Sequence, residues 1–153
     1  RAAMGRRAPS GVLEAAAGTI DASAPAPLLG KLGSPCFRLS RLRFGDSEPI
    51  GLQTTTIVIE QCPALPGFDF NRESLYDVLA REYRLAITEI QHTASAAIAD
   101  DLQAKLLQIR KGDPLLVIKT VAYLDSGEPI EATTSVYRAD HYEYNIRDTI
   151  GPC

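Results

Sequence analysis

The segments DSEPI (46–50) and DSGEPI (125–130) have nearly the same sequence and lie at two distant places in the chain. Both are rich in polar, turn-forming residues. Asp and Ser side chains bond to nearby backbone, and Pro restricts φ to a value that suits a sharp reversal. Runs rich in apolar and β-branched residues flank both turns. These runs are FRLSRLRF (37–44) and IGLQTTTIVIE (50–60), then PLLVIKTVAYL (114–124) and PIEATTSVYR (129–138). The repeated turn therefore predicts two β-hairpins.

A helix is predicted over residues 72–83, between the hairpins. Leu75, Val78 and Leu79 fall at helical spacing there, and Asn71 is a good N-cap. Residues 62–70, with two prolines and a glycine, are expected to form a loop.

A strand and a second helix complete the expected order of elements. Residues 86–99 read as a strand, and a short helix is expected to start at Asp100 or Asp101 and to stop at the KGDP segment (111–114). The order β-β-α-β-α-β-β predicts an α+β fold, a mostly antiparallel sheet with helices packed on one face. Residues 141–146, HYEYNI, are expected to be a polar tail.

Composition narrows the class of protein. A chain of 153 residues, 45% apolar and 23% charged, is expected to form one domain. Non-specific binding of nucleic acid requires a basic surface, and a chain with a net charge of −3 is a poor candidate for it. Cys36, Cys62 and Cys153 form no zinc spacing with His92 or His141, and no run of about 18 apolar residues occurs. We expect a cytoplasmic protein with no metal, no cofactor and no membrane partner.

The first 26 residues differ in composition from the rest. They are rich in Ala, Gly, Pro and Ser, and they are expected to be a linker or the remnant of an appended tag. The first residue is Arg and Met4 is internal, which suggests a larger parent protein. The ligand-binding domain is accordingly expected over 27–153.

Strand parity predicts one polar sheet face, because residues two apart share a face. In the last strand the polar face holds Glu131, Thr133, Ser135 and Tyr137. Arg41 and Arg43 share a face of the first strand, and Gln53 and Thr55 share a face of the second. Gln53 and Glu131 lie at similar distances from their turns, so they are expected on corresponding faces.

Two interpretations of the polar face stay open at this point. It can simply meet water, as one side of an antiparallel sheet often does. Alternatively it lines a pocket in which Arg41 and Arg43 supply cationic forks and Glu131 accepts hydroxyl or amino donors. The start of the predicted helix, with Ser74, adds free backbone N–H groups that suit an anion.

Several motifs occur together in a known order. They are RLRF (41–44), SLY (74–76), REYRLAI (81–87), AKLLQIRKGDPLL (104–116) and DSGEPIEATTSVYRADHY (125–142). Over residues 27–146 the chain resembles the UTRA domain, the effector-binding C-terminal domain of GntR-type transcription regulators of the HutC branch. The resemblance implies a chorismate-lyase-like fold, a small-molecule effector pocket, a homodimer and no enzyme activity. It also implies that DNA is contacted only through a winged helix-turn-helix domain, which is absent from this chain.

The resemblance also implies site residues. Positions that match the family's ligand contacts are Arg41, Arg43, Ser74, Tyr76, Glu131 and Tyr137, and Gln53 stands where members often have an acid. In members that sense amino-sugar phosphates, the arginines and the helix start hold phosphate while the acid holds sugar hydroxyls. The implied effector is therefore anionic and sugar-phosphate-like.

The domain and several of its residues allow alternative interpretations. The domain could be a chorismate-lyase-like enzyme that uses Arg41, Arg43 and Glu131 on an anionic substrate, or a purely structural dimerisation module. Tyr76 and Tyr137 could be core aromatics with only their hydroxyls in water. Arg138 and Asp140 are expected to form a structural ion pair, and His92 is expected to be solvated rather than catalytic.

Overall fold

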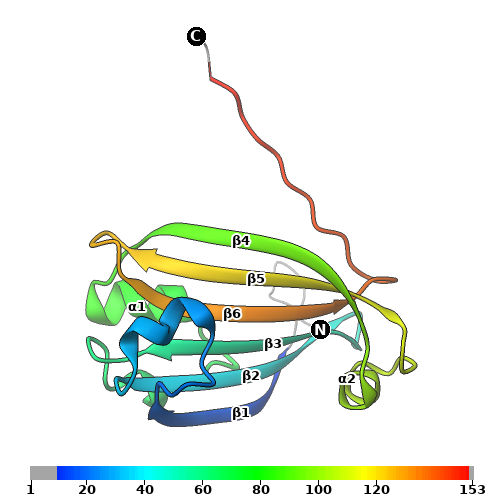
Figure 1. Cartoon of the computed structure of the whole chain (residues 1–153), viewed down its shortest axis with the longest axis horizontal. Coiled ribbons are helices and arrows are strands. Elements are labelled where there is room, and N and C mark those ends of the chain that lie inside the picture. Colours follow the sequence, from blue (N-terminus) through cyan, green and yellow to red (C-terminus); the bar gives the residue numbers. More distant parts are fainter. Residues whose placement is uncertain (1–9, 152–153) are drawn as a thin grey trace.

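The computed structural model describes residues 10–151, and its main feature is a single six-stranded antiparallel sheet (Figure 1). The strands are β1 (Ser10–Thr19), β2 (Pro35–Gly45), β3 (Glu48–Val58), β4 (Ile87–Ile98), β5 (Pro114–Leu124) and β6 (Pro129–Arg138). The helices are α1 (Leu75–Tyr83) and α2 (Asp101–Leu107), with short 3₁₀ helices η1 (Ala26–Lys31) and η2 (Leu65–Gly67). The sheet order is β1-β2-β3-β6-β5-β4. The predicted α+β class is confirmed.

Both predicted hairpins form at the repeated turns. Asp46 and Ser47 adopt positive φ values of 50° and 68°, the backbone of a tight two-residue turn between β2 and β3. Gly127 has φ 87° in the turn between β5 and β6. Strands β3 and β6 pair antiparallel, so the two hairpins lie side by side with their turns at opposite ends of the sheet.

Helix α1 begins later than predicted. Its N-cap is Ser74, not Asn71. The backbone N–H of Asn71 instead bonds to Asp69 Oδ1 at 3.0 Å, and Glu73 N–H bonds to the Asp69 carbonyl at 2.9 Å. Asn71 therefore belongs to a local turn ahead of the helix. The predicted start of α2 is confirmed, because Asp100 and Gln103 form a reciprocal capping box.

The helices cover both faces of the sheet, so the expected single helical face is wrong. Leu75, Val78 and Leu79 of α1 pack with Phe37 and Ile57 on one face. On the other face, η1 packs with Cys36, Val58 and Ala132, and α2 packs with Leu115, Val117 and Val136. Buried apolar side chains lie on both faces of the central strands, because Phe37 and Ile57 point to the α1 face while their neighbours Cys36 and Val58 point to the opposite face. The apolar side chains of one face are therefore covered by α1, and those of the other face by η1 and α2.

Strand β1 corrects the expected linker. Residues 10–19 pair along β2, with Ala15 opposite Leu39 and Ala17 opposite Phe37. Farther along, Ile20 and Leu28 are buried. Most β1 side chains are small and exposed, so backbone pairing with β2 forms this strand without the apolar alternation that marks strands in sequence. The part of the expected linker over 1–9 lies outside the described residues.

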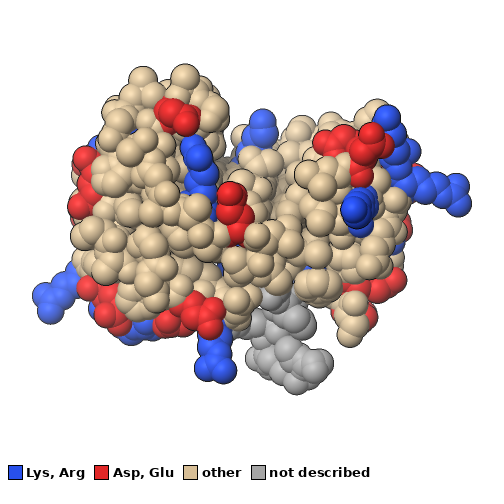
Figure 2. All heavy atoms as spheres, turned by 90° about the horizontal axis from the view of Figure 1, so that it is seen from below, with Lys and Arg blue, Asp and Glu red and all other residues tan. Residues whose placement is uncertain are grey.

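The surface carries charges of both signs. Figure 2 shows Lys and Arg interspersed with Asp and Glu on the face it presents, without a continuous basic patch. This agrees with the net charge of −3. Within residues 10–151, neither the length nor the apolarity of any helix is sufficient for a membrane span.

Candidate ligand-binding site

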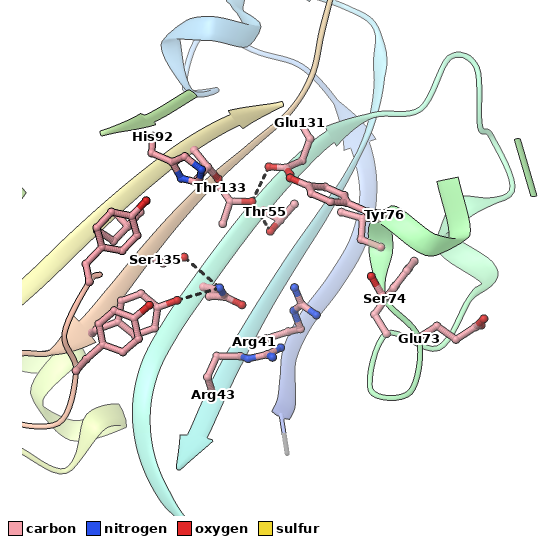
Figure 3. A pocket seen from close by; sticks show the side chains of 18 of the residues that line it. Arg41, Arg43, Thr55, Glu73, Ser74, Tyr76, His92, Glu131, Thr133 and Ser135 are labelled. Carbon is pink, nitrogen blue, oxygen red and sulfur yellow. Dashed lines mark hydrogen bonds between the residues drawn. The ribbon is translucent and has the colours of Figure 1, made fainter. Parts of the chain in front are cut away.

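A cavity of about 470 Å³ opens on the sheet face that carries α1 (Figure 3). Its walls come from five strands, the start of α1 and the segment after β6. All seven predicted site residues line it: Arg41, Arg43, Gln53, Ser74, Tyr76, Glu131 and Tyr137. The polar face that strand parity predicted therefore lines a cavity rather than a flat solvent-facing surface.

The register of the sheet brings these side chains together. Arg41 lies opposite Gln53, and Gln53 lies opposite Ser135. Thr55 lies opposite Thr133 in the same way. Residues opposite each other in antiparallel strands point to the same face, so β2, β3 and β6 present one continuous polar row. Gln53 and Glu131 share this face, as predicted.

A buried hydrogen-bond network centres on Glu131, which is only 2% exposed. Tyr76 donates its hydroxyl to Glu131 Oε1 at 2.6 Å, and Thr133 donates to Oε2 at 2.7 Å. Thr133 shares a further hydrogen bond of 2.8 Å with Thr55 (Figure 3). Burial raises the pKa of Glu131, and these hydrogen bonds and Arg41 oppose the rise. Hydrogen bonds thus connect Glu131 to side chains of β3, β6 and α1.

The raised pKa predicts a pH-dependent effect of Glu131→Gln. A carboxyl whose folded pKa exceeds its ordinary value of 4.5 stabilises the fold below that value, and this stability is lost as pH rises through the folded pKa. We therefore expect the unmutated chain to lose stability relative to Glu131→Gln as pH rises above 4.5. Urea unfolding of both chains between pH 4 and 7 measures the difference. A difference that is constant with pH would contradict the prediction.

Tyr76 and Gln53 are also fixed by partners rather than left as loose polar groups. Burial, followed by the bond to Glu131, raises the pKa of Tyr76, which keeps its hydroxyl protonated as a donor. Gln53 Nε2 donates to Ser135 Oγ at 3.1 Å and to Tyr137 Oη at 3.3 Å. The hydroxyl groups of Tyr76 and Tyr137, and not only their rings, therefore take part in the polar contacts of the cavity.

Gly51 makes room for the ring of Tyr137, which lies opposite it in the β3–β6 register. A Cβ at position 51 would come within 2.6 Å of Tyr137 Cδ1, closer than real side chains approach. We expect Gly51→Ala to displace the Tyr137 ring and to cost about 1–3 kcal/mol of unfolding free energy through overpacking. Gly18→Ala is the control, because nothing lies within 4 Å of the added methyl group on β1. Equal melting temperatures for the two variants would contradict this.

The cationic part of the cavity lies between β2 and the start of α1. Figure 3 shows Arg41 and Arg43 on β2, with Ser74 across from them. The Ser74 side chain makes no capping hydrogen bond to α1. Glu73 also lines the cavity, but its carboxylate accepts a hydrogen bond from Arg81 at 2.6 Å. Two guanidinium groups and a helix N-terminus together favour an anion.

Sequence reasoning missed several residues of the cavity, and three of them are aromatic side chains that reach it from β4 and from the segment after β6. His92, expected to be solvated, lines it together with Tyr142 and Tyr144 of the expected polar tail. The alternation in HYEYNI was the available signal, since it places both tyrosines on one side of an extended chain. The ion pair between Arg138 and Asp140, by contrast, forms as expected at 3.0 Å, and neither residue lines the cavity. No cluster of metal-ligating side chains occurs among residues 10–151.

Comparison with known proteins identifies the family. The model of the UTRA domain matches residues 3–143. The chain belongs to the UTRA domain family. The match begins ahead of the boundary expected at residue 27, and its extent agrees with the pairing of β1 in the sheet.

Named relatives of this UTRA domain are regulators of transcription. The HTH-type transcriptional repressor NagR of Bacillus subtilis (strain 168) is 30% identical over 111 residues, which cover 72% of this chain and 45% of NagR. The chain spans about half the length of the curated relatives it matches.

Solved structures share the fold. The effector domain of PhnF from Mycobacterium smegmatis has a TM-score of 0.82 at 25% identity, over 94% of this chain and 88% of that chain. The C-terminal domain of Yurk from Bacillus subtilis has a TM-score of 0.80 at 20% identity, over 90% and 94% of the two chains. The chain thus has the fold of the PhnF effector domain, and its family is the one that its motifs predicted.

Proposed function

We propose that this UTRA domain is the effector-sensing and dimerisation domain of a cytoplasmic transcription regulator of the HutC branch. Its effector is an anionic, sugar-phosphate-like metabolite, and DNA is bound by a winged helix-turn-helix domain outside this chain. The observation that carries the proposal is a single cavity in which Arg41, Arg43 and the start of α1 lie beside the buried Glu131 network.

The chemistry of the cavity suits a ligand with two different ends. Guanidinium groups and backbone N–H groups bind phosphate or carboxylate oxygens through charge-assisted hydrogen bonds. Each Glu131 oxygen accepts one hydrogen bond from the protein and has a further lone pair for a ligand hydroxyl or amino group. Gln53 adds an amide oxygen to the same polar row. An anion at one end and hydroxyl groups at the other use all of these partners.

Signalling by such a domain requires that the effector discriminate between two arrangements of the homodimer. The difference in effector affinity between the arrangements is all the free energy available to change the spacing of the DNA-binding domains. The cavity draws residues from five strands and from α1, so a ligand that bridges β2 and α1 can shift their relative position.

A thermal-shift screen tests the proposal. The chain is heated with sugar phosphates, free sugars, aromatic acids and nucleoside monophosphates, and the screen is repeated with Arg43→Ala. We expect a phosphorylated compound to raise the melting temperature in a saturable way, and the variant to lose this shift. A shift produced only by neutral compounds would contradict the anionic effector. The absence of any saturable shift would favour a purely structural dimerisation module.

The second candidate function is an enzyme that acts on an anionic substrate such as chorismate. One observation favours it: the buried carboxyl of Glu131 has a raised pKa and lies in one cavity with two arginines, a pattern shared by many catalytic acids. Incubation of the domain with chorismate, with 4-hydroxybenzoate as the measured product, separates the two candidates. We expect no turnover, and turnover that Glu131→Gln abolishes would overturn the purely sensory function.

A further inference from the structure

The segment that follows β6 forms one wall of the cavity. Tyr142 and Tyr144 are half-buried, whereas His141, Glu143 and Asn145 are exposed. Alternate residues of an extended chain point to opposite sides, so the two tyrosines share the side that faces the protein. Both line the cavity. The segment is therefore part of the site rather than a polar tail.

Two ring contacts hold this wall against the sheet. The ring of Tyr142 stacks on that of Tyr137, with centroids 3.8 Å apart and planes at 5°. The ring of Tyr144 lies 6.2 Å from that of His92, at 50°. Tyr137 is on β6 and His92 is on β4, so the segment passes over β5, which lies between them. The tyrosines thus extend the cavity wall beyond the sheet itself.

The wall depends on side chains more than on backbone pairing. His141 N–H bonds to the Arg138 carbonyl at 3.2 Å, and His141 Nε2 lies 3.9 Å from Glu48 Oε2. Beyond His141, within the described part of the chain, no helix or strand includes residues 142–151. Segments without a backbone ladder open at low cost, so the tyrosines can adjust their position to a ligand.

The distance between the arginines and the tyrosines fits a ligand of two parts. Arg43 is on β2 and the Tyr137–Tyr142 stack rises from β6, two strands away. Two strand spacings amount to about 10 Å. An anionic group joined to one six-membered ring has about this length, and it would place its ring beside the tyrosines. Aromatic side chains pack well against the flat, apolar face of such a ring.

We propose that Tyr142 and Tyr144 determine specificity by selecting an anionic ligand that carries a ring with an apolar face. This inference rests on the proposed function, because it takes the anion to lie at Arg41 and Arg43. The two tyrosines contribute little to binding of the anion alone. They distinguish a ring-bearing phosphate from inorganic phosphate.

Calorimetric titration of the 153-residue chain tests the inference. The probes are inorganic phosphate, glucose 6-phosphate and phenyl phosphate. We expect the unmutated chain to bind at least one of the ring-bearing phosphates about tenfold tighter than inorganic phosphate. Tyr142→Ala should remove most of this preference without changing the affinity for inorganic phosphate. Tyr142→Phe should retain it, because the ring is kept.

Two truncated chains form a matched pair. A chain that ends at Asn145 keeps both tyrosines and should keep the preference, whereas a chain that ends at Asp140 should lose it. An unchanged preference in Tyr142→Ala and in the chain ending at Asp140 overturns this inference alone. If none of the three phosphates binds the unmutated chain, the proposed anion site fails and this inference fails with it. Equal loss of all three probes in Tyr142→Ala, at an unchanged melting temperature, also overturns the specificity role.

Discussion

Arg43→Ala and Arg41→Ala are each expected to weaken binding of a phosphorylated ligand by about 10- to 150-fold. Each guanidinium group lies on the β2 wall of the cavity, opposite the start of α1. A hydrogen bond to a charged group contributes about 1.5–3 kcal/mol, which corresponds to this range of affinity. Isothermal titration with the phosphorylated compound found in the thermal-shift screen measures the change.

The same strand supplies a control for this experiment. Arg38 is also on β2, but it lies outside the cavity lining and its nearest acidic partner is Asp21 at 3.8 Å. Exposed pairs of this kind contribute little, so Arg38→Ala should leave the affinity unchanged. Arg43→Lys keeps the charge but not the planar fork, and it should restore only part of the affinity. Equal affinities for Arg43→Ala and Arg38→Ala would remove the arginines from the anion site.

Strand parity was sufficient to predict which side chains share the cavity face. The two-residue repeat of a strand requires Glu131, Thr133 and Ser135 to point the same way, whatever the rest of the fold does. The repeated turns then identified the two hairpins. Parity alone did not predict that β3 pairs with β6, because pairing between hairpins depends on contacts between distant parts of the sequence. In the structure, that pairing places Ser135 opposite Gln53 and completes the polar row.

The parts that were missed depend on contacts that composition and propensity do not reveal. Strand β1 is built from small residues such as Ala15 and Ala17, so nothing in its composition distinguishes it from a linker. The N-cap of α1 was placed at Asn71 because Asn caps helices well, but Asp69 engages this residue in a turn of its own. Tyr142 and Tyr144 join the cavity through contacts with residues of other strands. Tertiary contacts decide the first and third cases, whereas the second depends on a local turn that competes with the capping preference of Asn.

Arg138→Ala is expected to lower the free energy of unfolding by about 3 kcal/mol, the largest effect on stability that we predict outside the cavity. Arg138 is 8% exposed, and its Nη1 donates to the carbonyl oxygens of Pro49 at 3.5 Å and Leu107 at 3.4 Å. It therefore joins β6 to the start of β3 and to the end of α2. Replacement by Ala leaves a cavity and removes a donor from both carbonyls.

The matched variant is Asp140→Ala, which removes the ion pair but leaves the buried bonds of Arg138 in place. The side chain of Asp140 is 61% exposed, so its loss should cost less than about 1 kcal/mol. Urea unfolding of both variants measures the difference. Because neither residue lines the ligand cavity, both variants should bind the phosphorylated ligand normally while folded. Equal, small losses would show that the ion pair, and not the buried carbonyl contacts, accounts for the contribution of Arg138. A larger loss in Arg138→Ala with unchanged ligand affinity would separate the residues that hold the sheet and α2 together from those that hold the ligand.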